Sequence, residues 1–128
     1  DAIGNAGAGF SYNSGTLEIR SGAPPGPDAA DSGTLLASIA LPADAFAAAG
    51  TKSMAKAGTW QDASADAAGT AGHFRLKQSG DGGGAGSTFR RIEGTVTATG
   101  GGGDMTLDNA VIAAAQQVTI NTFTLSLP

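Results

Sequence analysis

The sequence predicts an all-β protein, folded as an antiparallel β-sandwich of about eight strands, either jelly-roll-like or immunoglobulin-like. Two observations favour this class. Turn signals arrive at short intervals, and the segments between them are rich in Thr, Val, Ile, Phe and Leu, with apolar and polar residues alternating. The 128 residues are enough for one domain. We expect residues 1–15 to form an extended N-terminal arm and residues 16–128 to form the sandwich domain.

The composition excludes several classes of protein. The chain has no Cys, so it has neither disulfides nor a thiolate metal site, and its single His excludes a histidine-rich metal site. A formal charge of −4 argues against nucleic acid as a partner. No apolar stretch approaches the roughly 18 residues that a membrane helix needs, so we expect no membrane partner. The large core residues are few, because 21 residues are Gly and Ala is abundant.

The first half of the chain carries four predicted strands. In the first of them, Leu17 and Ile19 alternate with Glu18 and Arg20, and a surface loop with three of the five prolines follows. The segment after the second strand is too short for a stable helix, so we expect a loop that buries Phe46. The four predicted strands are Thr16–Ser21, Thr34–Leu41 (Leu35, Ala37, Ile39 and Leu41 inward), Lys52–Lys56 and Thr59–Gln61.

The second half carries four more predicted strands, and two glycine tracts that form flexible turns connect the first three of them. Shifts in the parity of the apolar residues predict a β-bulge at Arg90–Arg91 and another near Asn121–Thr122. The residues between 109 and 116 are interpreted as a connection. The four predicted strands are Thr70–Lys77, Thr88–Thr99, Asp104–Asp108 and Gln117–Leu127.

A cluster of basic residues is the main candidate for a binding surface. In the strand Thr70–Lys77 the alternation directs Phe74 and Leu76 inward and the polar residues outward. The outward residues, with the basic pair of the next strand, form either a solvated face or an electropositive patch suited to an acidic protein partner. In the arm, two aromatic residues are placed to contact one surface. The predicted partner-binding residues are Phe10, Tyr12, His73, Arg75, Lys77, Arg90 and Arg91.

Several motifs resemble catalytic or ligand-binding sites. For each of them, a structural role explains the residues better than a functional one. Ser53 and Lys56 match the S-x-x-K string of serine acyl enzymes, but that chemistry needs a helix and the pair falls on a predicted strand. Trp60 is either a sugar-stacking platform or a core residue. Neither glycine tract is followed by the Lys of a phosphate-binding loop. The aspartates of the turns serve turn geometry or, as an alternative, calcium. We therefore expect no catalytic residue, cofactor or metal site.

Seven strings in order along the chain resemble a known family. They resemble those of small structural proteins of tailed bacteriophages that are encoded with the head genes. The matching segments are Ile3–Gly7, Gly15–Pro25, Gly33–Leu41, Gln61–Arg75, Ile92–Val96, Asp104–Asn109 and Val118–Leu125. The chain departs from the pattern in the glycine tract near residue 82 and in Lys52–Lys56.

The resemblance implies a non-enzymatic β-sandwich virion protein of the capsid decoration or cement type. Such a protein would bind the major capsid protein and itself, and we expect a homo-oligomer, a trimer by the same resemblance. It would be made in the host cytoplasm and lie on the capsid exterior. Two alternatives remain open from the residues: a component of the tail or tail fibre, and a carbohydrate-binding β-sandwich module that uses Trp60.

Overall fold

The structure is a computed structural model of the whole chain. It describes residues 12, 14–26, 28–43, 53–55, 58–86, 91–107, 110–120 and 124–126, with the backbone alone for 53–55 and 124–126. Every regular element in this part of the chain is a strand, so the predicted all-β class is confirmed. The strands are β1 (Thr16–Arg20), β2 (Leu35–Ala40), β3 (Ser53–Ala55), β4 (Trp60–Asp62), β5 (Gly69–Thr70), β6 (His73–Lys77), β7 (Arg91–Ala98), β8 (Met105–Leu107), β9 (Val111–Ile112), β10 (Val118–Ile120) and β11 (Thr124–Ser126).

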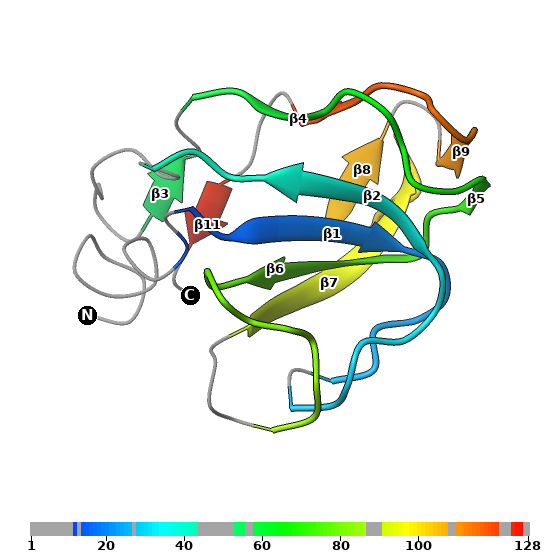
Figure 1. Cartoon of the computed structure of the whole chain (residues 1–128). Coiled ribbons are helices and arrows are strands. Elements are labelled where there is room, and N and C mark those ends of the chain that lie inside the picture. The colour runs from blue at the N-terminus through cyan, green and yellow to red at the C-terminus, as the bar shows by residue number, and fades with distance from the viewer. Residues whose placement is uncertain are drawn as a thin grey trace.

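A curved five-stranded sheet in the order β2-β1-β6-β7-β8 is the main element of the fold (Figure 1). The pairs β2–β1, β1–β6 and β6–β7 are antiparallel. Strand β6 lies at the centre of the sheet. Both of its neighbours pair with it over its whole length, and all five of its residues are buried.

The register of β1 and β6 separates an apolar face of the sheet from a charged face. Leu17 lies opposite Leu76, and Ile19 lies opposite Phe74. On the other face Glu18 lies opposite Arg75. Because side chains alternate along a strand, each residue of the second set points away from the core that the first set builds. The two faces therefore have different chemistry and are covered by different parts of the chain.

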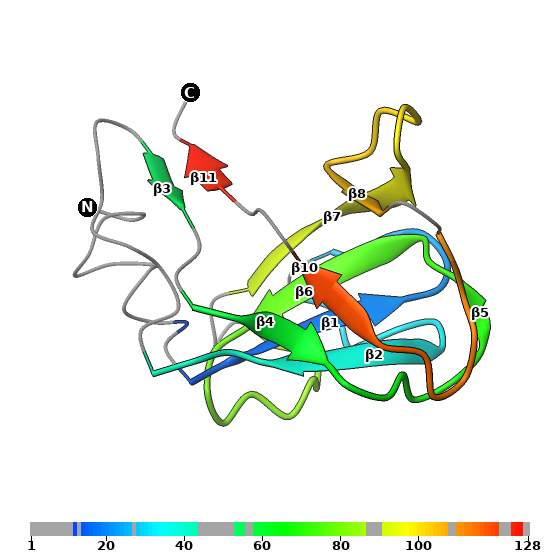
Figure 2. The same ribbon diagram turned by 90° about the horizontal axis from the view of Figure 1, so that it is seen from above.

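Strands β4 and β10 cover the apolar face (Figure 2), and the six strands outside the main sheet pair with one another. These form three two-stranded antiparallel sheets, β10–β4, β11–β3 and β5–β9. Figure 2 shows β4 and β10 lying over β1, β2 and β6. The resulting core consists of Tyr12, Leu17, Ile19, Leu36, Ala37, Ile39, Leu41, Trp60, Ala65, Ala71, Phe74, Leu76, Val96, Met105, Ile112, Val118 and Ile120.

Strand β2 differs from the predicted alternation at one residue. Arg20 pairs with Leu35 while Ile19 pairs with Ala37, so Leu36 is an extra residue in the ladder. Such an insertion is a β-bulge. The side chains on the two sides of the bulge no longer follow one alternation, so a residue predicted to point inward points to the opposite face of the sheet. Leu36 is fully buried in the core, whereas Leu35, predicted to face inward, is only partly buried. The inward prediction was wrong at Leu35 for this reason.

Two predicted strands are each divided in the structure. The segment Thr70–Lys77 breaks at Ala71–Gly72 into β5 and β6, which join different sheets. At Gly72 the amide N–H donates to the carbonyl of Arg20 at 2.9 Å, and a Cβ there would collide with the backbone of Gly22. The segment Gln117–Leu127 likewise divides into β10 and β11, which pair with β4 and β3. Its predicted bulge, Asn121–Thr122, lies outside the described residues, as do residues 44–52 with Phe46.

Strand β8 runs parallel to β7, although the prediction was an antiparallel arrangement throughout. Parallel neighbours usually need a long crossover, and here only residues 99–104 connect them. The glycine tract makes this short return feasible. Gly100 and Gly102 have φ angles of 91° and 82°, and Gly101 and Gly103 both lie against Thr97. These are conformations and close approaches that favour glycine.

Tyr12 belongs to the core and not to an exposed arm. Its side chain is only 1% exposed, and its carbonyl accepts the amide N–H of Gly15 at 2.9 Å. Next to it the amide N–H of Ser14 donates to the carbonyl of Pro42. Tyr12 was expected in an extended arm, and the structure places it in the core instead; its contact with a partner stays a prediction. Phe10, its predicted companion, lies outside the described residues.

Candidate functional site

The charged face of the sheet carries a buried set of ion pairs, which we call the charge network. Its cations come from β1, β6 and β7, and its carboxylates come from β1, β7 and two loops. The loops are the proline loop (residues 21–34, described except for residue 27) and the glycine loop (residues 78–86). The members of the charge network are Glu18, Arg20, Asp31, Arg75, Lys77, Asp81, Arg91 and Glu93.

Arg75 is the centre of the charge network and is fully buried. Its Nε and Nη2 both donate to Oε2 of Glu93, at 2.9 and 2.7 Å, and its Nη1 donates to Oδ1 of Asp31 at 2.8 Å. The same guanidinium donates to the carbonyls of Gly26 and Ala29 in the proline loop, at 2.9 and 3.0 Å. Arginine suits this position because its planar fork presents five donors that stay charged.

Lys77 lies beside two carboxylates. Its Nζ is 2.6 Å from Oδ2 of Asp31 and 3.0 Å from Oε1 of Glu18. Arg20 donates to the same two side chains, at 2.9 Å to Glu18 and 3.2 Å to Asp31. Asp31 thus accepts from three different cations, and the Lys77 side chain is only 4% exposed.

Arg91 and Asp81 form a second centre, held by two hydrogen bonds. Nε and Nη2 of Arg91 donate to the two carboxylate oxygens of Asp81 at 2.7 and 2.8 Å. The hydrogen bond from Arg91 is the largest influence on Asp81 and holds the pKa of that carboxyl below its usual value. The carboxylate in turn raises the pKa of Arg91. Arg91 also donates to the carbonyls of Ala29 and Gly84, so it contacts both loops.

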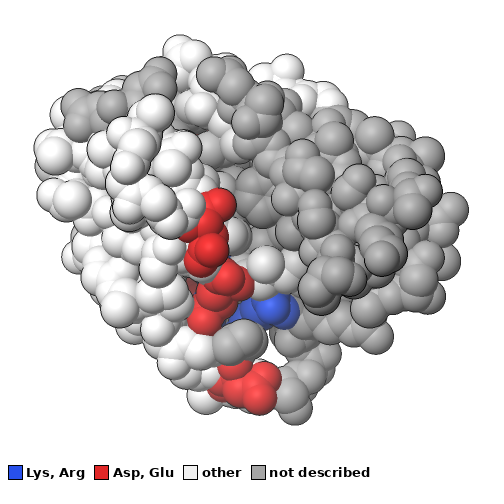
Figure 3. All heavy atoms as spheres, turned by 180° about the vertical axis from the view of Figure 1, so that it is seen from behind, with Lys and Arg blue, Asp and Glu red and all other residues white. Residues whose placement is uncertain are grey.

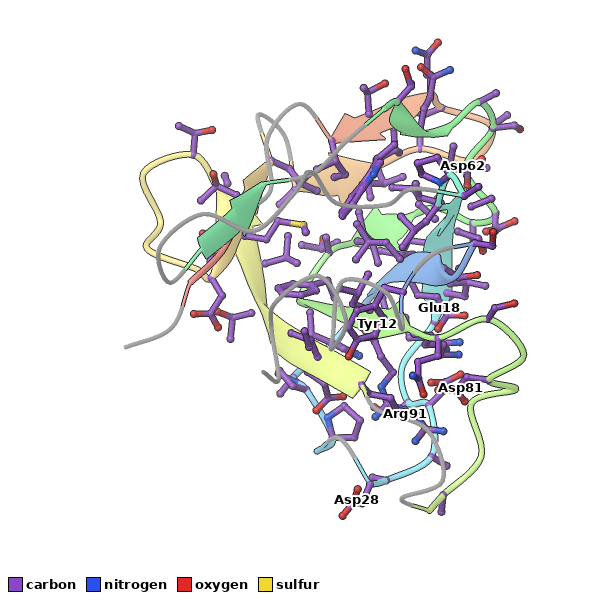
Figure 4. All side chains as sticks on the ribbon, turned by 90° about the vertical axis from the view of Figure 1, so that its left-hand side faces the viewer. Tyr12, Glu18, Asp28, Asp62, Asp81 and Arg91 are labelled. Carbon is purple, nitrogen blue, oxygen red and sulfur yellow. The ribbon has the colours of Figure 1, made fainter. Side chains whose placement is uncertain are left out.

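The two loops are joined to each other as well as to the sheet. The amide N–H of Asp31 donates to the carbonyl of Gly83, and that of Gly86 donates to the carbonyl of Asp28, both at 2.8 Å. In Figure 1 the two loops lie together on one side of the sheet. Figure 4 shows Glu18, Asp81 and Arg91 gathered close to one another, with Asp28 at the outer end of the loops. The loops therefore cover the charged face and shield its ion pairs from water.

His73 is the first residue of β6, at the end of the strand opposite to Lys77. It lies beneath the start of the proline loop. Its Nδ1 is 3.0 Å from the carbonyl oxygen of Gly22. A carbonyl only accepts, so Nδ1 carries the proton in this hydrogen bond. The ring is fully buried, and Nε2 has no hydrogen-bond partner among the described residues.

The prediction that the cations of β6 face outward was wrong. His73 and Arg75 are fully buried and Lys77 is 3% exposed, because the two loops cover the face to which they point. The Arg91 side chain is only 3% exposed. In the view of Figure 3, acidic groups follow one another down the surface, while Lys and Arg atoms emerge in a single small area. Arg90 lies outside the described residues. Contact of these residues with a partner stays a prediction.

The carboxylates of the charge network were missed by the sequence analysis. Glu18 and Glu93 share a face with Arg75, which the alternation within each strand shows. A sheet face that carries both signs of charge predicts internal pairing more strongly than an electropositive patch. Asp31 and Asp81 gave no such signal, because a loop sequence does not reveal which face the loop covers.

The other candidate sites have structural roles where they are described. Trp60 is fully buried in the core, so it offers no platform for a sugar. Asp62 accepts the amide N–H groups of Ser38 and Ser64, both at 2.9 Å, as an aspartate of a turn does. Ser53 lies in strand β3, as predicted, and Lys56 lies outside the described residues.

The part of the chain that the structure describes contains neither a metal-binding group nor a membrane-spanning helix. Within it, no group of three or more His, Asp or Glu side chains is arranged to hold a metal ion. The same residues include no helix of the length and apolarity that crossing a membrane requires.

Comparisons with known proteins do not assign the chain to a family. No protein-family model, no curated protein and no solved structure matches it. The function is therefore argued from the residues and from the geometry above.

Proposed function

We propose that the protein is a non-enzymatic structural component of a phage particle, which decorates or cements the capsid by binding the major capsid protein and itself. The observation that carries the proposal is the order of the seven strings that resemble phage head-encoded structural proteins. Those strings contain β1, β2 and β8 whole and parts of β6 and β7, which together are the five strands of the main sheet. The proposal includes a capsid-exterior location, synthesis in the host cytoplasm and a trimeric assembly.

The scaffold that we propose for this function is a two-layer β-sandwich. The five-stranded sheet is one layer, and the strands that cover its apolar face contribute the other. Support comes from the core, which draws residues from both sets of strands, such as Leu17 from β1 and Trp60 from β4. A protein that cements a particle needs a scaffold that keeps its shape, and buried polar contacts between loops and sheet serve that need.

The charge network limits how such a protein contacts its partner. Arg75, Lys77 and Arg91 each already hold a carboxylate of the same chain. Exchanging these carboxylates for those of a partner would first leave buried charges uncompensated, at a cost of about 3–5 kcal/mol for a buried pair. We therefore place the contact with the capsid on surfaces other than the charged face of the sheet.

Binding to capsids tests the proposal directly. Purified protein is added to expanded capsids that lack it, and occupancy is measured as a function of protein concentration. Saturable binding at a fixed number of sites is the expected result, and an absence of saturable binding would overturn the proposal. Immunolabelling of the virion distinguishes the head from the tail: we expect label on the head, and label on the tail would assign the protein to the tail or tail fibre.

A further inference from the structure

Lys77, Asp31 and Glu18 form a compact group whose chemistry extends beyond an ion pair. Nζ of Lys77 is 2.6 Å from Oδ2 of Asp31, and the carboxyl carbon Cγ lies one bond beyond that oxygen. Oε1 of Glu18 is 3.0 Å from the same Nζ. An amine held against a carboxyl group in a site shielded from water has the proximity that intramolecular amide formation requires.

We propose that Lys77 and Asp31 condense to an intramolecular isopeptide bond, with Glu18 as the group that transfers protons. The product is an amide between Nζ of Lys77 and Cγ of Asp31, and the by-product is one water molecule. This self-modification would fasten the proline loop covalently to β6. It does not depend on the proposed role at the capsid.

The protons and electrons of the step balance without any further reactant. Glu18 takes one proton from Nζ and delivers it to Oδ2 of Asp31, which leaves a neutral amine beside a neutral carboxyl group. The lone pair of Nζ then forms the bond to Cγ, and the carbonyl electron pair moves onto Oδ1. A second proton passes from Nζ to Oδ2, the Cγ–Oδ2 bond breaks, and Oδ2 departs as water. Oδ1 regains its double bond and the amide keeps the third proton of Nζ.

Arg75 is placed where the negative charge develops during this step. Its Nη1 donates to Oδ1 of Asp31 at 2.8 Å, and Oδ1 is the oxygen that becomes an oxyanion when Nζ bonds to Cγ. A preorganised cationic donor in a site shielded from water stabilises such a charge strongly. Arg20, at 3.2 Å, contacts the other oxygen, Oδ2, which departs. The two arginines thus contact different oxygens of the reacting carboxyl group.

Gly83 closes the site from the side of the glycine loop. The residue is buried, has a φ of 88°, and accepts the amide N–H of Asp31 at its carbonyl. A Cβ at this position would collide with Oδ2 of Asp31 and would lie 2.9 Å from Nζ of Lys77. The backbone of Gly83 therefore covers the reacting pair and shields it from most of the solvent, with 4% of the Lys77 side chain and 15% of the Asp31 side chain exposed. Exclusion of water favours condensation, because water is the product.

The charge balance of the network also permits the reaction. Condensation removes one cation and one carboxylate together; Arg20 and Arg75 lose the charge of Asp31, but every remaining group keeps one partner of opposite charge. Glu93 stays with Arg75, Asp81 stays with Arg91, and Glu18 stays with Arg20. A buried ion pair repays its desolvation cost poorly, whereas a neutral amide carries a much smaller desolvation cost.

Intact mass of the denatured full-length protein tests the inference. We expect wild-type protein to weigh less than its sequence by one water molecule. Digestion with trypsin should then release the peptides 21–52 and 76–90 joined to each other, because trypsin does not cut after an acylated Lys77. Folded wild-type protein with the full mass of its sequence would overturn the inference. A water loss confined to peptide 21–52 would also overturn it, since that result indicates a succinimide at Asp31.

Two variants add independent tests. Lys77→Arg keeps the positive charge but lacks a nucleophilic amine, so it should show the full mass of its sequence. Glu18→Gln keeps the size of the side chain but cannot accept the proton, so it should accumulate the uncondensed form. Full condensation in Glu18→Gln would contradict the role of Glu18. If Lys77→Arg fails to melt cooperatively, the wild-type peptide map and Glu18→Gln still decide the question.

Discussion

Replacement of Arg75 by Met measures how much the charge network contributes to the fold. The substitution keeps an unbranched apolar stem but removes the guanidinium and its five hydrogen bonds. Oε2 of Glu93 then loses both of its hydrogen bonds from the guanidinium. Oε1 of Glu93 keeps the amide N–H of Gly26 at 2.8 Å, and the carbonyl of Ala29 keeps Arg91 at 3.1 Å.

The expected cost follows from the charge that the substitution leaves behind. Removing one partner of a buried ion pair costs about 3–5 kcal/mol. A domain of this size is stable by roughly 5–15 kcal/mol, so the variant should lose a large part of its free energy of unfolding. The double variant Arg75→Met/Glu93→Gln removes the orphaned charge as well. It should therefore recover part of the loss, with a coupling of about 0.5–3 kcal/mol.

Urea unfolding followed by circular dichroism gives these free energies. Thr106→Met introduces the same side chain at an exposed position of β8 and should change stability by no more than about 0.5 kcal/mol. If Arg75→Met is as stable as Thr106→Met, the ion pairs of Arg75 contribute nothing to the fold and the reasoning fails. Equal stability of the single and double variants would refute the assignment of the cost to Glu93.

Three further predictions concern the loops, the effect of pH and the core. Gly83→Ala should destabilise the protein by roughly 1–3 kcal/mol, because its φ is positive and a Cβ would collide with Asp31, whereas Gly82→Ala, which has open space, should be neutral in the same urea assay. Asp81 has a lowered pKa in the fold, so its stabilising contribution is present above about pH 4 and is lost as the pH falls through the folded value. Urea midpoints measured across that range should therefore fall more steeply for wild type than for Asp81→Asn; parallel curves would contradict this. The single Trp60 is fully buried, so its fluorescence should be blue-shifted and poorly quenched by iodide, and efficient quenching in the native state would contradict its place in the core.

The alternation of residues predicted most of the main sheet. Leu17 with Ile19 and Phe74 with Leu76 were placed on an apolar face, and the structure pairs them there. A period of two shows which residues share a face. It does not show whether the opposite face is open to water. The pattern therefore predicted an exposed Arg75, whereas the structure buries this residue.

The remaining errors arise from contacts between distant parts of the chain. Arg75 and Asp31 are 44 residues apart, so nothing local in either segment reveals their pairing. The bulge at Leu36 is likewise a property of its pairing with β1 and not of its own sequence. Tyr12 was assigned to an arm because its neighbours are small and polar, whereas its burial depends on the core that it contacts.

The proline and glycine loops are fastened to each other and to the charged face of the sheet, and the burial of the charge network depends on this arrangement. Amide hydrogen exchange measured by NMR tests it most directly. The amide protons of Asp31 and Gly86 donate to carbonyls of the opposite loop at 2.8 Å, so they should exchange much more slowly than amides of an unstructured chain. Exchange of both amides at unstructured rates in the native protein would show that the loops are not fastened, and would contradict the account.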